Sequence, residues 1–338
     1  PTPRPTPTPV PSPSPNLALS APGPIVTQDW SGPFVPAAVA VASDSGLVLV
    51  GAVGDESGNG IVATSADAGA NWRVERLSVP ALGTVTAAGT TIWASTACPV
   101  AATSGCSPDL IVSTDNGLTW QLSPMTGTWH PDLLDDERGW TLSPIGAQQV
   151  STISTISTTA DGGATWSAGR AVCGATAPVA DWLSFPSAAA GWLACVGDSG
   201  VGSQTKQLLR SVDLGRTWSL LSAISTNSGV KPVGTMPLDG QLGGISMLAS
   251  GQGWLWTSQG LFASSDGGRT WAPIAYQDPT GGTIVLGAGL TGTEGTDGTT
   301  GMGGYALVRD GATGVVRLTV SSDGGQTWQD VHDWPPAH

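Results

Sequence analysis

The 338-residue chain is poor in charge, and what charge it has is mostly negative: 12 Lys and Arg stand against 25 Asp and Glu. The formal net charge of −13 repels phosphate backbones, so we expect no nucleic-acid partner. No basic run is present to bind anionic lipids. Nor does any apolar stretch reach the roughly 18 residues of a membrane-spanning helix. We therefore expect no membrane span in this sequence, which leaves an anchor upstream of it open.

Cysteine and histidine are scarce. Two local disulfides, Cys98–Cys106 and Cys173–Cys195, are the simplest pairing, although three connectivities exist and four buried thiols are the alternative. Disulfides would imply an oxidising, extracytoplasmic compartment. No Cys-x-x-Cys pattern occurs and the three histidines are isolated, so we expect no metal site and no cofactor.

Tyrosine (2) and phenylalanine (3) are nearly absent, whereas tryptophan (15) and glycine (48) are abundant. Six tryptophans end copies of one eight-residue pattern, which reads Ser/Thr-x-Asp-x-Gly-x-Thr-Trp with Asn71 in place of Thr in the first copy. The paired Asp and Trp residues are Asp67 and Trp72, Asp115 and Trp120, Asp161 and Trp166, Asp213 and Trp218, Asp266 and Trp271, and Asp323 and Trp328. A repeat of such regular spacing dictates the architecture.

Each copy is predicted to be a tight turn between two antiparallel strands, because apolar β-prone residues precede it and Trp opens a further strand. The Asp side chain can accept hydrogen bonds from backbone N–H groups of its own turn. The Gly two places later supplies a positive φ without steric cost, and the Trp ring buries a large area. These roles are structural, so the six Asp residues are not counted as catalytic carboxylates.

The pattern resembles the Asp-box, or BNR, repeats of sialidases, sortilin-type receptors, some glycoside hydrolases and photosystem II assembly factors. That resemblance covers nearly the whole chain outside its N-terminal tail. The sequence around the boxes divides into six units of four strands, at about 37–78, 84–123, 129–170, 178–222, 242–275 and 283–332. Four-stranded units repeated radially predict an all-β fold, a six-bladed β-propeller over residues 25–338.

Two features leave alternatives open. A seventh blade would have to come from residues 25–36, where a single strand at 25–30 could instead pair with the first or last blade and latch the ring. Residues 1–24 alternate proline with threonine and serine, which favours an extended linker; a glycosylated stalk or a docking strand are the alternatives. Such a spacer often tethers an exterior domain, so we expect a secreted or surface-anchored bacterial protein.

In the predicted strand order, the box hairpins share one face of the ring with the turns between first and second strands. Ligand sites of propellers usually lie on the other face, called here the loop face. Its loops carry these candidate binding residues: Asp55, Glu56, Asp109, Trp129, His130, Asp132, Lys206, Tyr276 and Asp278. Two oxygen-rich stretches, 54–60 and 132–137, match no defined calcium loop, so calcium is kept only as an alternative.

Two functions compete. A sialidase-like or other glycoside hydrolase would need an arginine cluster for the substrate carboxylate, a Tyr nucleophile and an acidic partner. Few of the ten arginines fall where a central cluster must form, and Tyr276 and Tyr305 are the only tyrosines. We therefore favour a non-catalytic binding or scaffold protein, with a protein or carbohydrate partner at the cell surface, over the enzyme.

Overall fold

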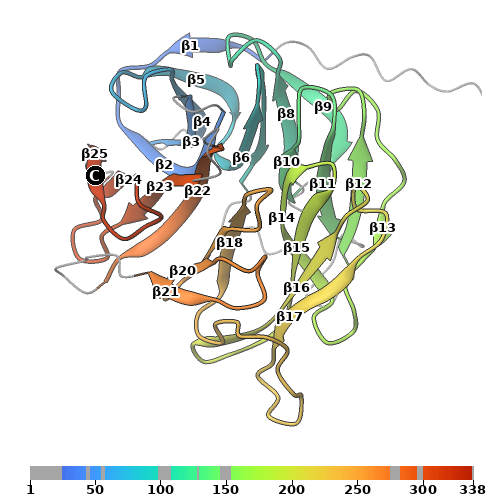
Figure 1. Ribbon diagram of the computed structural model, residues 1–338. Helices are drawn as coiled ribbons and strands as arrows, with labels where there is room; N and C mark the ends of the chain where they lie inside the picture. Colours follow the sequence, from blue (N-terminus) through green and yellow to red (C-terminus); the bar gives the residue numbers. More distant parts are fainter. Residues whose placement is uncertain are drawn as a thin grey trace, which may run out of the picture.

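The computed structural model is a ring of six β-sheets around a central channel (Figure 1). It describes residues 25–42, 46–54, 58–97, 108–127, 129–144, 154–274, 282–294 and 300–336; the side chains of 126, 129, 144, 293, 294 and 300–302 are not described. No helix occurs among these residues, and thus none long and apolar enough to cross a membrane. The prediction of a six-bladed all-β propeller is confirmed, and the seven-bladed alternative is not.

Each blade consists of four strands that follow one another in the chain, from the channel outward. The strands are as follows: blade one, β2 (Phe34–Val41), β3 (Leu47–Val53), β4 (Asn59–Ser65) and β5 (Arg73–Pro80); blade two, β6 (Leu82–Ala88), β7 (Thr91–Thr96), β8 (Asp109–Ser113) and β9 (Gln121–Thr126); blade three, β10 (Trp129–Leu133), β11 (Gly139–Pro144), β12 (Ser154–Thr159) and β13 (Arg170–Ala171); blade four, β14 (Val179–Ser187), β15 (Ala190–Gly200), β16 (Ser203–Ser211) and β17 (Ser219–Ile224); blade five, β18 (Leu242–Met247), β19 (Gly253–Thr257), β20 (Gly260–Ser264) and β21 (Ala272–Ile274); blade six, β22 (Ile284–Glu294), β23 (Thr300–Arg309), β24 (Val316–Ser321) and β25 (Gln329–Trp334).

The N-terminal strand does not latch the last blade. β1 (Thr27–Asp29) pairs antiparallel with β5 and so adds a fifth strand to the outer edge of blade one. Ile25, just before it, bridges to Trp120 in blade two. β1 therefore joins the first two blades, whereas the first and last blades meet as two sheets, each built from its own strands.

The boxes form hairpins as expected. In blade four, Ser211 Oγ donates to Asp213 Oδ1 (2.8 Å), and the same carboxylate accepts from the backbone N–H and hydroxyl of Thr217 (2.9 and 2.6 Å). These hydrogen bonds lower the pKa of Asp213 to about 2, and the bond from the Thr217 side chain has the largest effect. In blade one Asn71 replaces Thr, and its amide takes over the bond to Asp67 (2.7 Å).

The backbone of the boxes is more unusual than the sequence indicates. The box glycine has φ between 76° and 93° in all six copies, as predicted. The residue before it also has a positive φ, including Ala68, Asn116 and Leu214, which pay a steric cost for it. The Ser or Thr at the first box position offsets this cost, because its hydroxyl accepts the N–H of the glycine, as Ser211 does from Gly215 (2.8 Å).

A second set of tryptophans lies deeper than the box set. Trp93, Trp192 and Trp254 in the second strands of their blades are fully buried. Trp93 and Trp254 pack against the box Trp of the next blade, with ring centroids 5.3 Å apart in both pairs. Glycines make room for these rings, because a Cβ on Gly139 would approach Trp93 to 2.6 Å. At these interfaces between blades, tryptophan rings thus pack on one another and directly against the backbone of glycine residues.

Candidate functional site

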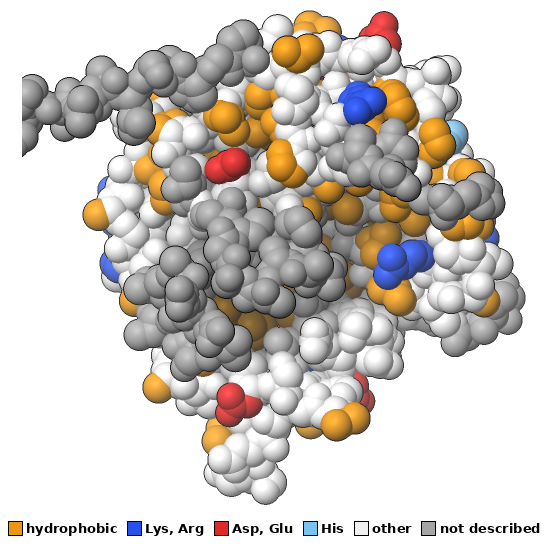
Figure 2. All heavy atoms as spheres, turned by 180° about the vertical axis from the view of Figure 1, so that it is seen from behind, with side chains coloured by type: hydrophobic (Ala, Val, Ile, Leu, Met, Phe, Trp, Pro, Cys, Tyr) orange, Lys and Arg blue, Asp and Glu red, His pale blue; other side chains and the backbone are white. Residues whose placement is uncertain are grey.

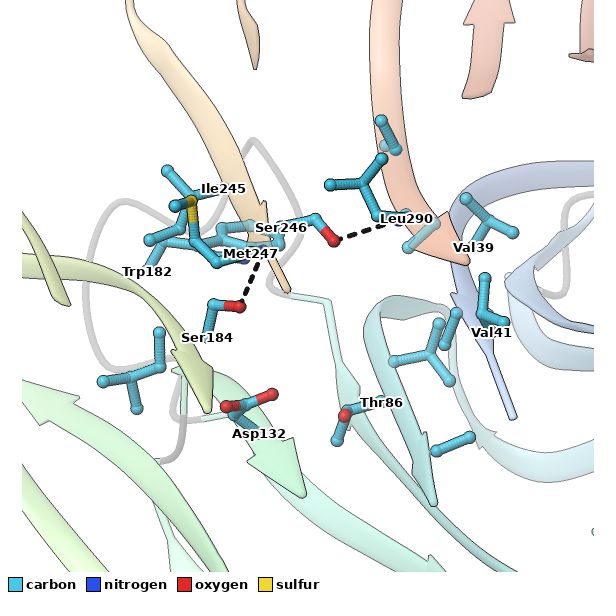
Figure 3. A pocket seen from close by; sticks show the side chains of 18 of the residues that line it. Val39, Val41, Thr86, Asp132, Trp182, Ser184, Ile245, Ser246, Met247 and Leu290 are labelled. Atoms are coloured by element: carbon cyan, nitrogen blue, oxygen red, sulfur yellow. Dashed lines mark hydrogen bonds between the residues drawn. The ribbon is translucent and has the colours of Figure 1, made fainter. Parts of the chain in front are cut away.

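The innermost strands of all six blades, β2, β6, β10, β14, β18 and β22, surround a central cavity of about 200 Å³ (Figure 3). Most of the described residues that line it carry apolar side chains, Val39, Val41, Leu133, Met247 and Leu290 among them, and polar groups make up much of the surface exposed to the cavity. Asp132 is the one ionisable side chain among those lining residues. Figure 2 shows the molecule from behind, where hydrophobic side chains are exposed around the middle of the face.

A belt of side chains connects neighbouring blades around this channel. The side-chain oxygen of one inner strand accepts the backbone N–H of the next: Thr86 from Leu133 (3.3 Å), Asp132 from Phe185 (2.6 Å), Ser184 from Met247 (3.0 Å) and Ser246 from Leu290 (3.1 Å). The equivalent positions in blades six and one are Gly289 and Ala40, which have no side-chain oxygen. We call Ala40, Thr86, Asp132, Ser184, Ser246 and Gly289 the channel belt.

Asp132 differs chemically from the other members of the belt. Serine and threonine hydroxyls make the same inter-blade bond at three neighbouring positions, so this bond does not require a carboxyl group. Burial raises the pKa of Asp132 to about 7, although bonds from the N–H groups of Phe185 and Leu133 act in the opposite direction. The side chain therefore carries acceptor capacity and charge that the architecture does not use.

Every inner strand contains one β-bulge within its first four residues, at the end nearest the loop face. The extra residues are Ala37, Gly83, His130 with Pro131, Asp181, Gly243 and Leu286. Bulges re-aim side chains and are enriched beside functional sites. Only blades three and four place ionisable residues there, and His130 adopts a positive φ of 45°.

These bulges bring together His130, Asp181, Trp182 and Trp256, the mouth cluster. The His130 ring lies 4.1 Å from that of Trp182, whose other neighbour, Trp256, is 5.4 Å away, edge-on. His130 Nε2 is 3.9 Å from Asp181 Oδ1, and the two side chains are 18% and 28% exposed. His130 Nδ1 is buried without a hydrogen-bond partner.

Electrostatics in the mouth cluster are dominated by burial. It lowers the pKa of His130 to about 4 and raises the pKa of Asp181 to about 6. At neutral pH the imidazole is therefore neutral and the contact with Asp181 is not an ion pair. A pair of carboxyls with raised pKa values, one in the channel and one at its mouth, is an arrangement typical of functional sites.

Of the candidate residues named from the sequence, the structure brings His130 and Asp132 to this site. Asp109 begins β8 in blade two, apart from the cluster. Trp129 begins β10, with its side chain outside the described part. Asp55, Glu56, Tyr276 and Asp278 lie outside the described residues, as does the predicted Cys98–Cys106 disulfide. The Cys173–Cys195 disulfide is present.

Lys206 is not on an exposed loop. It is fully buried, and its ammonium donates to the carbonyls of Gln204, Pro237, Leu238 and Gly240 at 3.3, 3.1, 3.0 and 2.7 Å. Its charge is thus solvated by backbone carbonyls and fixes the segment that connects blades four and five. This placement leaves no N–H of Lys206 free for a ligand.

The carboxyl groups of the oxygen-rich stretch 132–137 do not converge on one point. Asp135 bonds Arg138 in its own turn, and Asp136 Oδ1 accepts from the N–H groups of Thr90 and Thr91 in blade two (3.1 Å each). Asp132 faces the channel instead. Within the described ranges, no group of three His, Cys, Asp or Glu side chains could hold a metal ion.

Sequence reasoning missed Asp181 and Trp182. They fell just inside the expected fourth unit rather than on a loop. An alignment of the six repeats would have placed Asp181 opposite His130, at the position where other blades carry Ala, Gly or Leu. The ionisable residues at this position in blades three and four were therefore the available sign of a site in the sequence.

The residues expected of a sialidase lie elsewhere. Tyr305 is 5% exposed and packs in the core between blades one and six. Arg170 donates to the carbonyls of Gly215 and Arg216 in the fourth box, and Arg73 to that of Asn116 in the second (2.7 Å). Both arginines thus join neighbouring blades at the box side. No arginine is among the described residues that line the channel.

Comparison with known proteins agrees with this architecture. A family model described as BNR/Asp-box repeat matches residues 111–122, which contain the second box. No curated protein matches the chain.

Three solved structures illustrate the likeness. The α-L-arabinofuranosidase Arb93A from Fusarium graminearum is 12% identical, with 90% of this chain and 98% of that chain covered and a TM-score of 0.56. The β-propeller domain of the Trilobed protease from Pyrococcus furiosus, with an open velcro topology, is 9% identical, with 89% and 98% covered and a TM-score of 0.51. YCF48 from Cyanidioschyzon merolae is 16% identical, with 91% and 88% covered and a TM-score of 0.49. At these identities the likeness concerns the fold alone.

Proposed function

We propose that this chain, a six-bladed β-propeller built from Asp-box repeats, is a non-catalytic binding protein that acts outside the cytoplasm and holds its ligand at the mouth of the central channel. The observation that carries the proposal is the mouth cluster. Bulges in two adjacent inner strands place His130 and Asp181 beside Trp182, which itself lines the channel. Aromatic rings beside a few convergent polar groups in a concavity are typical of ligand sites.

The proposed location rests on two features. The Cys173–Cys195 disulfide is of a kind that persists in oxidising compartments. The proline-rich segment 1–24 would serve as a spacer between the ring and a surface. Alkylation of the protein isolated from its native cells without reductant tests the compartment: we expect Cys173 and Cys195 to be unmodified, and their alkylation would contradict an oxidising location.

The site itself is tested with a glycan array and with affinity capture from the native cell envelope. The site variant is Trp182→Ala combined with Asp181→Ala, which removes an aromatic ring and a carboxyl from the mouth. The matched control is Arg216→Ala, an exposed change in the fourth box on the other face. We expect the site variant to lose the ligand and the control to keep it, with both folded by circular dichroism. Equal retention by both would refute the site.

A second function is favoured by one observation. Asp132 and Asp181 are carboxyls on adjacent inner strands, both with raised pKa values, and glycosidases that use paired carboxylates require one acid that stays protonated near neutrality. An aryl α-L-arabinofuranoside and an aryl sialoside are suitable substrates, chosen from the activities of enzymes with this fold. Turnover that Asp132→Asn abolishes would replace the binding proposal with the enzymatic one.

A further inference from the structure

Asp132 has a carboxyl group at a position where a hydroxyl is enough to make the inter-blade hydrogen bond. Ser184 and Ser246, two further members of the channel belt, accept the corresponding inter-blade N–H groups at 3.0 and 3.1 Å. One oxygen of Asp132 makes that bond to Phe185 at 2.6 Å, and a carboxylate offers about four lone-pair positions in total. The remaining acceptor capacity faces the cavity that the side chain lines.

A lone buried carboxylate among mostly apolar side chains is costly unless a positive charge or a proton neutralises it. Apart from Asp132, the described lining residues carry no ionisable side chain, so the walls supply no counter-charge. The titratable groups nearest the loop-face end are His130, which burial keeps neutral, and Asp181, which is acidic. Once Asp132 has lost its proton, the described channel therefore lacks one positive charge, and the net charge of −13 attracts cations toward the molecule.

We propose that the channel binds a primary ammonium group on a short unbranched alkyl chain, with the ammonium on the Asp132 carboxylate and the chain against the apolar side chains that line the cavity. This inference rests on the proposed function, because it names the ligand class of the same site. A free alkylamine and a lysine side chain of a partner protein present the same chemistry.

The walls favour an alkylammonium over other cations. Asp132 is the one carboxylate among the described lining residues, and the hydroxyl oxygens of Thr86, Ser184 and Ser246 each accept a backbone N–H, whereas a bound Ca²⁺ takes six to eight oxygen ligands, usually several carboxylates among them. An ammonium needs fewer acceptors, since it has three donors on a compact head, and its stem matches Val39, Val41 and Leu133. The cavity of about 200 Å³ is smaller than the roughly 300–1,000 Å³ of drug-sized sites, which suits one such chain.

The test uses the full chain and nuclear magnetic resonance, with n-butylamine as the cationic probe, n-butanol as its neutral counterpart and butyrate as its anionic one. The readouts are the backbone amide of Phe185, the indole signals of Trp182 and Trp256, and the carboxyl carbon of Asp132. We expect butylamine alone to shift the Phe185 amide and to lower the pKa of Asp132. Its binding should weaken as the pH falls from 8 to 6, because burial raises that pKa to about 7 in the free protein.

Asp132→Ser is the decisive variant, because serine makes the inter-blade bond at two other belt positions. Loss of a hydrogen bond to a charged group should weaken butylamine binding roughly 10- to 100-fold, while the variant melts at a temperature no lower than that of the unaltered protein. Asp132→Asn repeats the loss of charge with a side chain of the original shape. Peptides with lysine or acetyllysine at their ends distinguish a protein partner from a free amine, since only the unmodified lysine should bind.

Three results would overturn the inference. These are butylamine binding unchanged by Asp132→Ser, an equal response to butanol, and a fall in the pKa of Asp132 with potassium or sodium chloride that butylamine does not exceed. If butylamine fails while a glycan or envelope partner still depends on Trp182 and Asp181, the ligand class is wrong and the binding site stands. If no ligand depends on those residues, the proposed function fails as well.

Discussion

Each Asp box works through a few side-chain atoms that replace missing backbone bonds in a strained hairpin. In blade five, Ser264 Oγ donates to Asp266 Oδ1, and Trp271 Nε1 donates to the carbonyl of Gly268 (3.0 and 3.1 Å). The Trp271 ring is 8% exposed and packs against residues of blade four. At the residue scale, therefore, the box couples a local turn to an interface between blades.

The first expected outcome concerns this coupling. Trp271→Ala should lower the free energy of unfolding by about 3–5 kcal/mol, as other buried large-to-small changes do. Ser211→Ala should cost less, about 1–3 kcal/mol, because it leaves the Gly215 N–H without its acceptor. Chemical denaturation measures both. A change near zero for Trp271→Ala would contradict its place in the blade core.

The second expected outcome concerns how the stability of the protein depends on pH through Asp132. Its pKa of about 7 in the folded protein exceeds the ordinary value of 3.8, so the folded state binds the proton more tightly. The resulting stabilisation is complete below pH 4 and is lost as the pH rises toward 7. His130 acts oppositely, since its pKa falls from 6.5 to about 4 and stability from that group rises over this range. Asp181, whose pKa burial raises to about 6, acts in the same direction as Asp132, so the separate contributions can be resolved only by substitution.

Asp132→Ser removes the acidic contribution and keeps the inter-blade bond. The variant should gain stability over the unaltered protein as the pH rises from 5 to 8, by about 3 kcal/mol, since two units separate pH 5 from the folded-state pKa and one unit corresponds to about 1.4 kcal/mol. Melting temperatures at a series of pH values measure this. Asp109→Ser, a change away from the channel, is the control and should show no such trend. Parallel curves for Asp132→Ser and the unaltered protein would refute the shifted pKa.

At the scale of elements, β1 and the disulfide reinforce the ring in different places. β1 covers the outer edge of β5, which would otherwise present unpaired backbone groups. Ile25 is 9% exposed and packs in the core between blades one and two. The Cys173–Cys195 disulfide links the segment before β14 to β15 in blade four.

Truncation tests the role of β1. Removal of residues 1–29 should lower the melting temperature more than removal of residues 1–24, because only the longer truncation removes Ile25 and β1, which pair with Trp120 and β5. Ile25→Ala alone should cost about 2–5 kcal/mol. Equal melting of the two truncated proteins would show that β1 contributes nothing to the ring.

At the scale of the whole molecule, the closure between blades six and one is distinctive. Among the residues that the structure describes, no strand is exchanged across it, and the belt positions Gly289 and Ala40 provide no side-chain oxygen. Blades three to six, in contrast, are tied in sequence by Asp132, Ser184 and Ser246. Apolar packing of Phe34, Leu318 and Trp334 therefore carries much of the closure.

Local opening should follow this asymmetry. We expect native-state hydrogen exchange to be faster in β2 and β22 than in β14 and β18, because fewer side-chain bonds join the former strands across their interface. Exchange followed by mass spectrometry resolves these segments. Uniform protection of all four strands would show that packing alone holds the ring equally at every interface.

The sequence by itself determined the architecture. The spacing of Asp67, Asp115 and their four counterparts fixed the number of blades, and the positive φ of the box glycines followed from the turn. These are local effects: hydrogen bonds and φ preferences within eight residues decide them, and regular repetition extends them to the whole chain. The N-terminal strand was also expected, and of its two expected partners, the first and the last blade, it pairs with the first.

Only the tertiary structure decided which side chains meet. Asp132 and Lys206 both read as loop-face residues, yet one lines the channel and the other is enclosed by four carbonyls. His130 and Asp181 are brought together because bulges in two separate strands turn toward one another. A β-bulge and the packing of sheets around a common axis depend on residues far apart in the chain, so one repeat read alone does not reveal them.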